Sequence, residues 1–354
     1  MASRAPHSST ALRRDRGISR RSFFLGSAGL AGAASTGLLT GCGNGAGASG
    51  GDGGLTAVDY QLAWLRNIQF AGDFAAVENG YFEDNGIDVD LLAGGPSVDG
   101  IAVVGGGSAP VGLARSNEIV VARGTGYPVR AIGVILQDNP FGMMYRPDDP
   151  ITSLEEMYGR TVAVADSSQA EVEGAMERQG LDPSEVNFVP KSPDPSVLPE
   201  GQVDAYWGFV STEAAVLTAE DVDVDWVLMS DLGERASANV LFATEDAIEQ
   251  EPEMLTNVLR AVIAGWQWAV DNVEEAAELV AEDYAEDDVA VDVAVEQMRA
   301  QVPLIEGGAA EQDGIGALRP DVFEENIELS LDSGLIDEEL DVEDVIDPQF
   351  FEAL

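Results

Sequence analysis

The residues that could bind a small molecule are neutral hydrogen-bonding side chains, glycines and flat aromatic rings, and they gather at the predicted ends of strands. In open α/β sheets, ligands bind outside the carboxyl ends of the strands, where loops meet helix N-termini. The candidate ligand-binding residues are Trp64, Asn67, Gln69, Phe70, Gly95, Ser116, Gln137, Asn139, Ser167, Ser168, Tyr206, Trp207 and Glu213. Amides can read the polar edge of a flat heteroaromatic solute, and indoles can stack on its faces.

Residues 206–209 place three aromatic rings in four residues, at the end of a predicted strand over 203–210. Side chains alternate along a strand, so Tyr206 and Trp207 face opposite sides of the sheet. We expect one ring to pack in the core and the indole of Trp207 to face Trp64 across a shared cleft. The alternative is that Trp207 is itself a core residue.

Histidine and cysteine usage excludes several kinds of catalysis. His7 is the only histidine and Cys42 the only cysteine. Both lie near the N-terminus, so the rest of the chain has no imidazole or thiol for Ser-His-Asp or Cys-His catalysis or for metal ligation. The sequence therefore predicts no catalytic residue, no metal site and no cofactor.

The net charge of −46 is carried by 64 acidic and 18 basic residues. Phosphate binding needs clustered Lys and Arg, so a nucleic-acid partner is excluded. Dense carboxylates are screened at high salt, and we interpret the excess as the surface of a halophilic or salt-tolerant protein. The alternative is an ordinary acidic secreted protein.

The elements that position the candidate residues begin with a strand–helix–strand unit. Alternating apolar residues predict a strand over 58–65, helical spacing predicts a helix over 70–80, and a second strand covers 87–92 before Gly94-Gly95-Pro96. The same pattern recurs after residue 160, where Asp166-Ser167-Ser168 lies at a strand-to-helix junction and a serine is a plausible helix N-cap.

An apolar stripe starting at Pro252 predicts a long packing helix that includes Trp266 and Trp268. The acidic segment 337–347 is expected to be loosely held.

The opening unit resembles a known family. Its residues read WLRNIQFAGDFAAVENGYFEDNGIDVDLLAGGP (64–96), and the likeness continues through VDAYWGFVSTEAAVL (203–217) and EPEMLTNVLRAVIAGWQWAVDN (251–272). These segments are similar to the solute-binding proteins of ABC importers, in the branch named for nitrate, sulfonate and taurine uptake and for thiamine-pyrimidine synthesis. The resemblance covers most of residues 55–305.

The resemblance implies a type II periplasmic-binding-protein fold, with two α/β lobes joined by two hinge crossings. We expect lobe I to comprise 55–146 and 236–354, and lobe II to comprise 147–235. The implied function is solute capture by hinge closure, as a monomer, and delivery to a membrane permease with its ATPase.

The solute is predicted to be heteroaromatic and similar to a thiamine-pyrimidine precursor, because Gly94-Gly95-Pro96 resembles that branch. The opening loop lacks the histidine usual there, so nitrate, sulfonate, taurine and riboflavin-type solutes stay open. Two different classes of function also stay open: a pyrimidine-synthase-like enzyme and a lipid-anchored sensor domain. By resemblance, the synthase uses a histidine and a metal.

Residues 1–41 are predicted to be a twin-arginine lipoprotein signal peptide. Arg20-Arg21 precede a short run of small apolar residues, and Leu39-Thr40-Gly41-Cys42 resembles a lipobox with Cys42 as the lipidated residue. Residues 42–54 are rich in Gly, Ala and Ser and are expected to form a flexible tether. We expect an extracytoplasmic protein anchored to the cell membrane by its lipid; a transmembrane anchor is the alternative.

Overall fold

A computed structural model describes residues 54–354, apart from the side chain of Ser167. The predicted signal peptide, Cys42 and nearly all of the tether lie outside these residues. Within 54–354, no helix is both long enough and apolar enough to cross a membrane.

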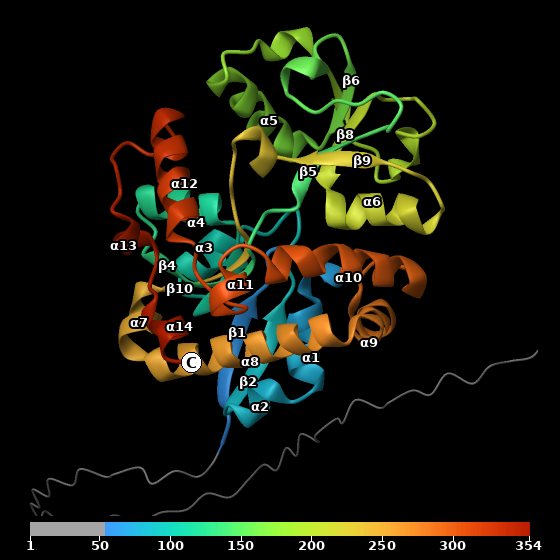
Figure 1. The fold of residues 1–354 in the computed structure, drawn as a ribbon. Helices are drawn as coiled ribbons and strands as arrows, with labels where there is room; N and C mark the ends of the chain where they lie inside the picture. Colours follow the sequence, from blue (N-terminus) through green and yellow to red (C-terminus); the bar gives the residue numbers. More distant parts are fainter. Residues whose placement is uncertain (1–53) are drawn as a thin grey trace, which may run out of the picture. The chain divides into compact units, whose positions relative to one another are not determined.

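The first sheet has the strand order β2-β1-β3-β10-β4 (Figure 1). Its strands are β1 (Thr56–Gln61), β2 (Ile87–Leu92), β3 (Val111–Ala114), β4 (Val129–Leu136) and β10 (Ala238–Thr244). Strands β1, β2 and β3 are parallel, whereas β10 runs antiparallel to both β3 and β4. All seven residues of β10 are buried, as expected of a strand inside a sheet that helices cover on both faces.

Helices cover both faces of the first sheet and form two separate apolar clusters with it. The larger cluster includes residues of η1 (Ile68–Phe70), α1 (Ala71–Glu78), α2 (Tyr81–Asp84), α7 (Glu245–Gln250), α8 (Pro252–Asp271), α9 (Val273–Leu279), α10 (Val291–Glu306) and α14 (Gln349–Glu352). The other includes residues of α3 (Gly100–Gly105), α4 (Ser116–Gly124), α12 (Pro320–Asp332) and α13 (Val342–Val345). The apolar stripe of α8 packs on α1, and Trp266 is fully buried there, as its spacing predicts.

The second sheet has the order β7-β6-β8-β5-β9. Its strands are β5 (Phe141–Tyr145), β6 (Thr161–Val164), β7 (Asn187–Pro190), β8 (Ala205–Phe209) and β9 (Asp225–Leu228). Strands β6, β7 and β8 are parallel. One face packs against α5 (Asp166–Arg178), and the other packs against α6 (Val210–Ala219).

The chain passes from the first sheet to the second between Leu136 and Phe141, and it returns between Leu228 and Ala238. The predicted boundary at Arg146 is therefore wrong by one strand, because β5 pairs with β8 and β9. The Pro/Asp-rich residues that suggested a crossing form a turn after β5, in which the Asp149 N–H donates to the Arg146 carbonyl at 3.0 Å.

The acidic C-terminal segment is packed rather than loose. Val345 and Ile346 are buried, and the Asp347 carboxylate accepts from the Arg130 guanidinium at 3.1 Å. Arg130 also donates to the carbonyl of Ile346 at 2.7 Å. The prediction for 337–347 was wrong because one buried apolar pair and one arginine fix a segment whose composition is otherwise acidic.

Candidate functional site

Four predicted ligand residues lie in the opening loop between β1 and α1, and only one of them, Trp64, is exposed. Strand β1 ends at Gln61, so Trp64 lies in the loop, where it is 43% exposed. The Asn67 side-chain oxygen accepts from the Gln69 N–H at 2.8 Å and caps η1. Gln69 and Asn239 exchange two hydrogen bonds of 2.8 and 2.7 Å, and Phe70 is fully buried. Trp64 is therefore the most exposed of these four residues, whereas Asn67 and Gln69 are half-buried.

The turn Gly94-Gly95-Pro96 is in close contact with the opening loop. The Gly94 N–H donates to the Trp64 carbonyl at 2.9 Å. A Cβ atom at Gly94 would lie 2.7 Å from the Leu62 carbonyl oxygen, so only glycine allows this approach. Gly95 has a φ of 134°, which also favours glycine. Both glycines are buried, so they set the position of the Trp64 loop.

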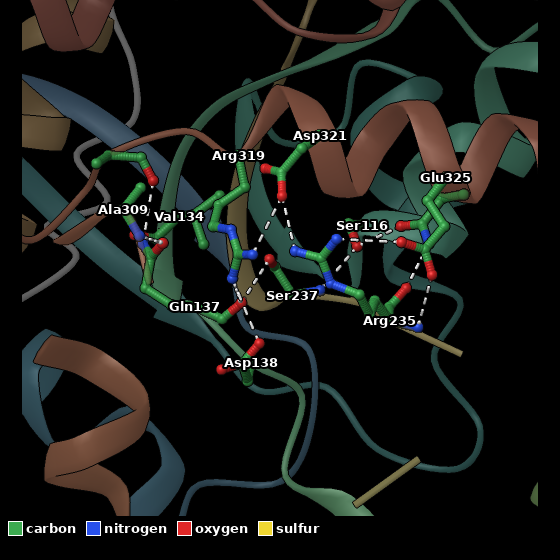
Figure 2. Close-up of polar contacts among 12 residues, drawn as sticks. Ser116, Val134, Gln137, Asp138, Arg235, Ser237, Ala309, Arg319, Asp321 and Glu325 are labelled. Atoms are coloured by element: carbon green, nitrogen blue, oxygen red, sulfur yellow. Dashed lines mark hydrogen bonds and ion pairs between the residues drawn. The ribbon is translucent and has the colours of Figure 1, made fainter. Parts of the chain in front are cut away.

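Three predicted ligand residues, Ser116, Gln137 and Asn139, lie instead in the hinge region, where they are buried and hydrogen-bonded. Figure 2 shows Ser116 and Gln137. Ser116 donates to the Asn326 side chain at 2.6 Å and accepts from the Ser237 N–H at 2.9 Å. Gln137 donates to the carbonyl of Ala317 at 3.0 Å and accepts from the Ala309 N–H at 3.2 Å.

Asn139 accepts from the Phe141 N–H at 3.2 Å, and its own backbone N–H donates to the Ala236 carbonyl at 2.8 Å. The expectation that Ser116, Gln137 and Asn139 contact a solute is corrected by these bonds, since their polar atoms join the two crossings to the first lobe.

Two arginines form hydrogen bonds and ion pairs at the crossings (Figure 2). Arg319, at the start of α12, donates to the Gln137 carbonyl at 3.2 Å and to the Asp138 carboxylate at 3.3 Å. Arg235, on the return crossing, bonds Asp321 at 2.7 Å and Glu325 at 3.2 Å. Helix α12 therefore anchors the two hinge segments through ion pairs that sequence spacing does not reveal.

The aromatic segment of the second lobe is core on both faces. Tyr206 and Trp207 are each fully buried, in different apolar clusters, as strand alternation requires. The Trp207 indole packs against Phe141 with a centroid separation of 5.3 Å, and its N–H has no partner among the described residues. The Tyr206 hydroxyl donates to the Ser192 carbonyl at 2.6 Å. The expected aromatic platform is wrong for this structure, because sheet packing encloses both rings.

Helix α5 starts at Asp166, immediately after β6, with Ala165 at the N-cap position and no side-chain cap bond. The predicted serine N-cap is therefore not seen, because Ala165 takes that position and the Ser168 N–H donates to its carbonyl at 2.9 Å. Ser168 is half-buried in the first turn, and Ser167 precedes it in the same turn.

An ion pair at the carboxyl edge of the parallel strands was missed by sequence reasoning. Lys191 directly follows β7, and its ammonium contacts Oε1 of Glu213 in the first turn of α6. A Cβ at Gly208 would lie 2.7 Å from the lysine nitrogen and 2.8 Å from Oε1, so glycine makes room for the pair. The signal available in the sequence was that Lys191 is the only lysine.

The second oxygen of Glu213, Oε2, is buried without a hydrogen-bond partner among residues 54–354. Burial raises the pKa of the Glu213 carboxyl, while the Lys191 ammonium opposes that rise. The ammonium also lies 5.0 Å from the centroid of the Tyr206 ring. The pair thus leaves one carboxylate oxygen able to accept a hydrogen bond from a solute.

Two polar contacts join the lobes. The Arg115 guanidinium, before α4, donates to both oxygens of Glu171 on α5 at 3.1 and 3.0 Å. Gln297 of α10 donates to the Thr212 carbonyl of α6 at 3.3 Å. A groove of about 970 Å³ lies between α4, α5 and α12, with Arg115 and Glu171 among its lining residues.

No group of three or more His, Cys, Asp or Glu side chains in the range 54–354 could hold a metal ion. Among the candidate residues, Trp64 has an exposed indole and Glu213 has an unpartnered carboxylate oxygen. Such groups bind and orient a polar ring.

Comparison with known proteins gives consistent matches. A family model described as NMT1/THI5 like matches residues 67–276. The formylaminopyrimidine-binding protein of Halalkalibacterium halodurans is 26% identical over 65% of this chain and 71% of its own. The riboflavin-binding protein RibY of Chloroflexus aurantiacus is 22% identical over 84% of this chain and 86% of its own. Other relatives are named as 4-amino-5-hydroxymethyl-2-methylpyrimidine phosphate synthases.

Among solved structures, the periplasmic aliphatic sulphonate binding protein SsuA from Escherichia coli aligns with a TM-score of 0.62 at 16% identity, covering 84% of this chain and 99% of that one. This likeness confirms the predicted two-lobed periplasmic-binding-protein fold.

Proposed function

The chain belongs to the NMT1/THI5-like family, whose model covers 67–276, and from this premise we propose that it is the solute-binding component of an ABC importer. It captures a small solute outside the cytoplasm and delivers it to a permease driven by a separate ATPase. The solute bridges the two lobes and shifts the open–closed equilibrium by binding the closed state more tightly.

The observation that carries the proposal is the hinge. Two crossings lie side by side, joined by the bond between the Asn139 N–H and the Ala236 carbonyl. The bonds of Gln137 and Arg319 fix their ends to the first lobe. Two sheets joined by two short, adjacent crossings form the architecture that allows hinge closure around a ligand.

The charges between the lobes favour a neutral solute over nitrate or a sulfonate. Anion recognition needs charge-assisted donors, most often arginine. Arg115 already bonds Glu118 and Glu171, and Lys191 already bonds Glu213. A bound anion would have to displace a carboxylate from its cation. The buried Oε2 of Glu213 has no hydrogen-bond partner among residues 54–354, and an N–H group of a heteroaromatic solute would satisfy it.

We assign the solute contacts to Trp64, Asn67 and Glu213, with the first turn of α5, which includes Ser167 and Ser168, facing a polar atom of the ring. A pyrimidine related to thiamine precursors fits this set of donors and acceptors. The larger flavin ring is the second candidate, because RibY matches over most of both chains.

A synthase-like enzyme is the competing function, since some relatives carry that name. His7 and Cys42 are the only histidine and cysteine of the chain, and both precede the binding domain. We therefore assign the domain no catalytic step. Incubation with candidate precursors and chromatography of the products checks this, because any turnover would contradict the assignment.

For location we propose twin-arginine export through residues 1–41, lipidation of Cys42 and attachment through the tether 42–54. A domain tethered in this way stays near its permease while it opens and closes.

The test is a thermal-shift screen of the purified full-length chain, followed by calorimetry, over aminopyrimidines, riboflavin, alkanesulfonates and nitrate at low and molar salt. We expect an aminopyrimidine or flavin to raise the melting temperature in a concentration-dependent way. Binding of a sulfonate or nitrate alone would contradict the assigned solute class. Failure of every solute would contradict the transport role.

A further inference from the structure

The ion pair between Lys191 and Glu213 joins two elements at the edge where the second lobe meets the first. Lys191 follows β7, and Glu213 lies in the first turn of α6, whose Thr212 carbonyl accepts from Gln297 of the other lobe. The side chains are only 20% and 17% exposed. The pair is therefore largely removed from water and next to the lobe interface.

Glu213 can exist in two forms with opposite hydrogen-bonding character. As a carboxylate, it only accepts hydrogen bonds; as a carboxylic acid, it donates one. Burial favours the acid, whereas the neighbouring ammonium favours the carboxylate. Lys191 therefore acts against the burial that raises the pKa of the Glu213 carboxyl.

The other groups near this carboxyl do not replace the lysine. The Tyr206 hydroxyl donates to the Ser192 carbonyl, and Gln297 of α10 is neutral and bonds the main chain. Burial, with Glu213 and Asp194 adding to it, raises the pKa of the Tyr206 hydroxyl, so Tyr206 stays neutral. The ionisable residues of α10 are Asp292, Glu296, Arg299 and Glu306, and Arg299 is occupied by Glu274 and Glu296.

We propose that Lys191 determines the solute selectivity of the binding site by keeping Glu213 a carboxylate whose free Oε2 must accept a hydrogen bond. The inference rests on the proposed binding function. It deepens that function by naming the required chemistry: a solute that presents an N–H donor, such as an amino-substituted ring, and not one that presents acceptors alone. Lys191 acts through Glu213 and is a positioning residue.

Gly208 supports this assignment. Its missing side chain leaves the space that the ammonium and Oε1 occupy together, at 2.7 and 2.8 Å from where a Cβ would stand. With Oε1 taken by Lys191, Oε2 is the oxygen left over, and it has no partner in the described part of the chain. The arrangement therefore decides which of the two carboxyl oxygens is left for a further hydrogen bond.

The first experiment needs no ligand. Infrared difference spectroscopy of the full chain, with Glu213→Gln used to assign the band, reports whether Glu213 is protonated. We expect a carboxylate in the wild type at pH 7, a carboxylic acid in Lys191→Met, and a carboxylate again in Lys191→Arg, which keeps the positive charge. A protonated Glu213 in the wild type, or an ionised one in Lys191→Met, would overturn the proposal.

The second experiment uses two probes in calorimetry: 4-amino-2-methylpyrimidine, which carries N–H donors, and 1,3-dimethyluracil, which carries acceptors only. We expect Lys191→Met to lose about tenfold or more in affinity for the amino probe at pH 7 and to regain part of it as rising pH ionises Glu213. The ratio of the two affinities should move toward the acceptor-only probe. Lys191→Arg should retain most of the wild-type ratio.

The two experiments separate the possible failures. If the spectra follow the expectation but the wild type binds neither probe, then the proposed solute class fails while the control of Glu213 by Lys191 stands. An unchanged affinity ratio in a folded Lys191→Met chain that does bind would refute the selectivity role.

Discussion

Asp73 offers a quantitative test of the packing between α1 and α8. Its side chain is completely buried. The Tyr60 hydroxyl donates to Oδ1 at 2.9 Å, and the Trp266 indole N–H donates to Oδ2 at 3.2 Å. Burial raises the pKa of this carboxyl from 3.8 to about 7, although both hydrogen bonds oppose the rise.

The sign of the effect on stability follows from proton binding. Between the unfolded and folded pKa values, the folded chain holds a proton on Asp73 that the unfolded chain has released. Raising the pH across this interval therefore favours unfolding. Across the whole interval the free energy of unfolding falls by about 4 kcal/mol, and about 2.5 kcal/mol of this loss occurs between pH 5 and pH 8.

The perturbation is Asp73→Asn, which does not titrate and can donate its amide to the Tyr60 oxygen while it accepts from Trp266. Urea unfolding of both full-length chains at several pH values gives the two free energies of unfolding. We expect the free energy of unfolding of the wild type, minus that of the variant, to fall by about 2.5 kcal/mol from pH 5 to pH 8. Other titrating groups cancel in this difference.

Asp59→Asn is the matched control, because Asp59 is exposed on the same strand as Tyr60. It removes an exposed carboxyl from that strand, so it shows how much of the difference comes from any Asp-to-Asn change rather than from the buried carboxyl. A constant difference for Asp73→Asn would refute the reasoning, since it would mean that the buried carboxyl titrates alike in both states.

Four further expectations concern the core, the lobe interface, the surface charge and the anchor. Trp207→Ala should lower the free energy of unfolding by about 3–5 kcal/mol in urea titration and leave affinity in the folded fraction unchanged; weaker binding at full stability would place Trp207 in the ligand site. Glu171→Gln should increase the radius of gyration of the solute-free chain in X-ray scattering, whereas Glu118→Gln, which removes the partner of Arg115 in its own lobe, should not; equal radii would show that the cross-lobe pair does not hold the lobes together. Because the net charge is −46, the melting temperature should rise from low to molar salt, and a flat response would contradict the halophilic interpretation. Cys42→Ser should release the protein from membranes, and continued membrane partitioning with an intact N-terminus would favour a transmembrane anchor.

The architecture could be predicted because it rests on local patterns. The opening strand–helix–strand unit appears as β1, α1 and β2, and the apolar stripe of α8 packs where its period places it. The first crossing was misplaced because Pro147 and Pro150 are strong turn signals, while the pairing of β5 with β8 depends on residues about sixty positions away.

The candidate site was harder to predict because a polar side chain at a strand end can serve a loop as well as a ligand. Ser116 and Gln137 stand at strand ends as expected, but their partners Asn326, Ala309 and Ala317 lie between 172 and 210 residues later. No local pattern encodes such partners. Lys191 and Glu213 likewise come together only through the order of β7 and β8 in the sheet.

The place of β10 in the first sheet has a consequence for how the chain is made. This strand fills the gap between β3 and β4, yet it emerges from the ribosome after the whole second lobe. Until it arrives, β3 and β4 expose unpaired edges, and an early pairing of these two would have to be undone. Lobe II, which is inserted in the chain, can fold during synthesis. Lobe I cannot complete its sheet until the ribosome has passed Thr244, the last residue of β10. A secretion route that accepts only finished domains would suit such a chain better than one that threads it unfolded, because cytoplasmic residence gives the late strand time to find its place.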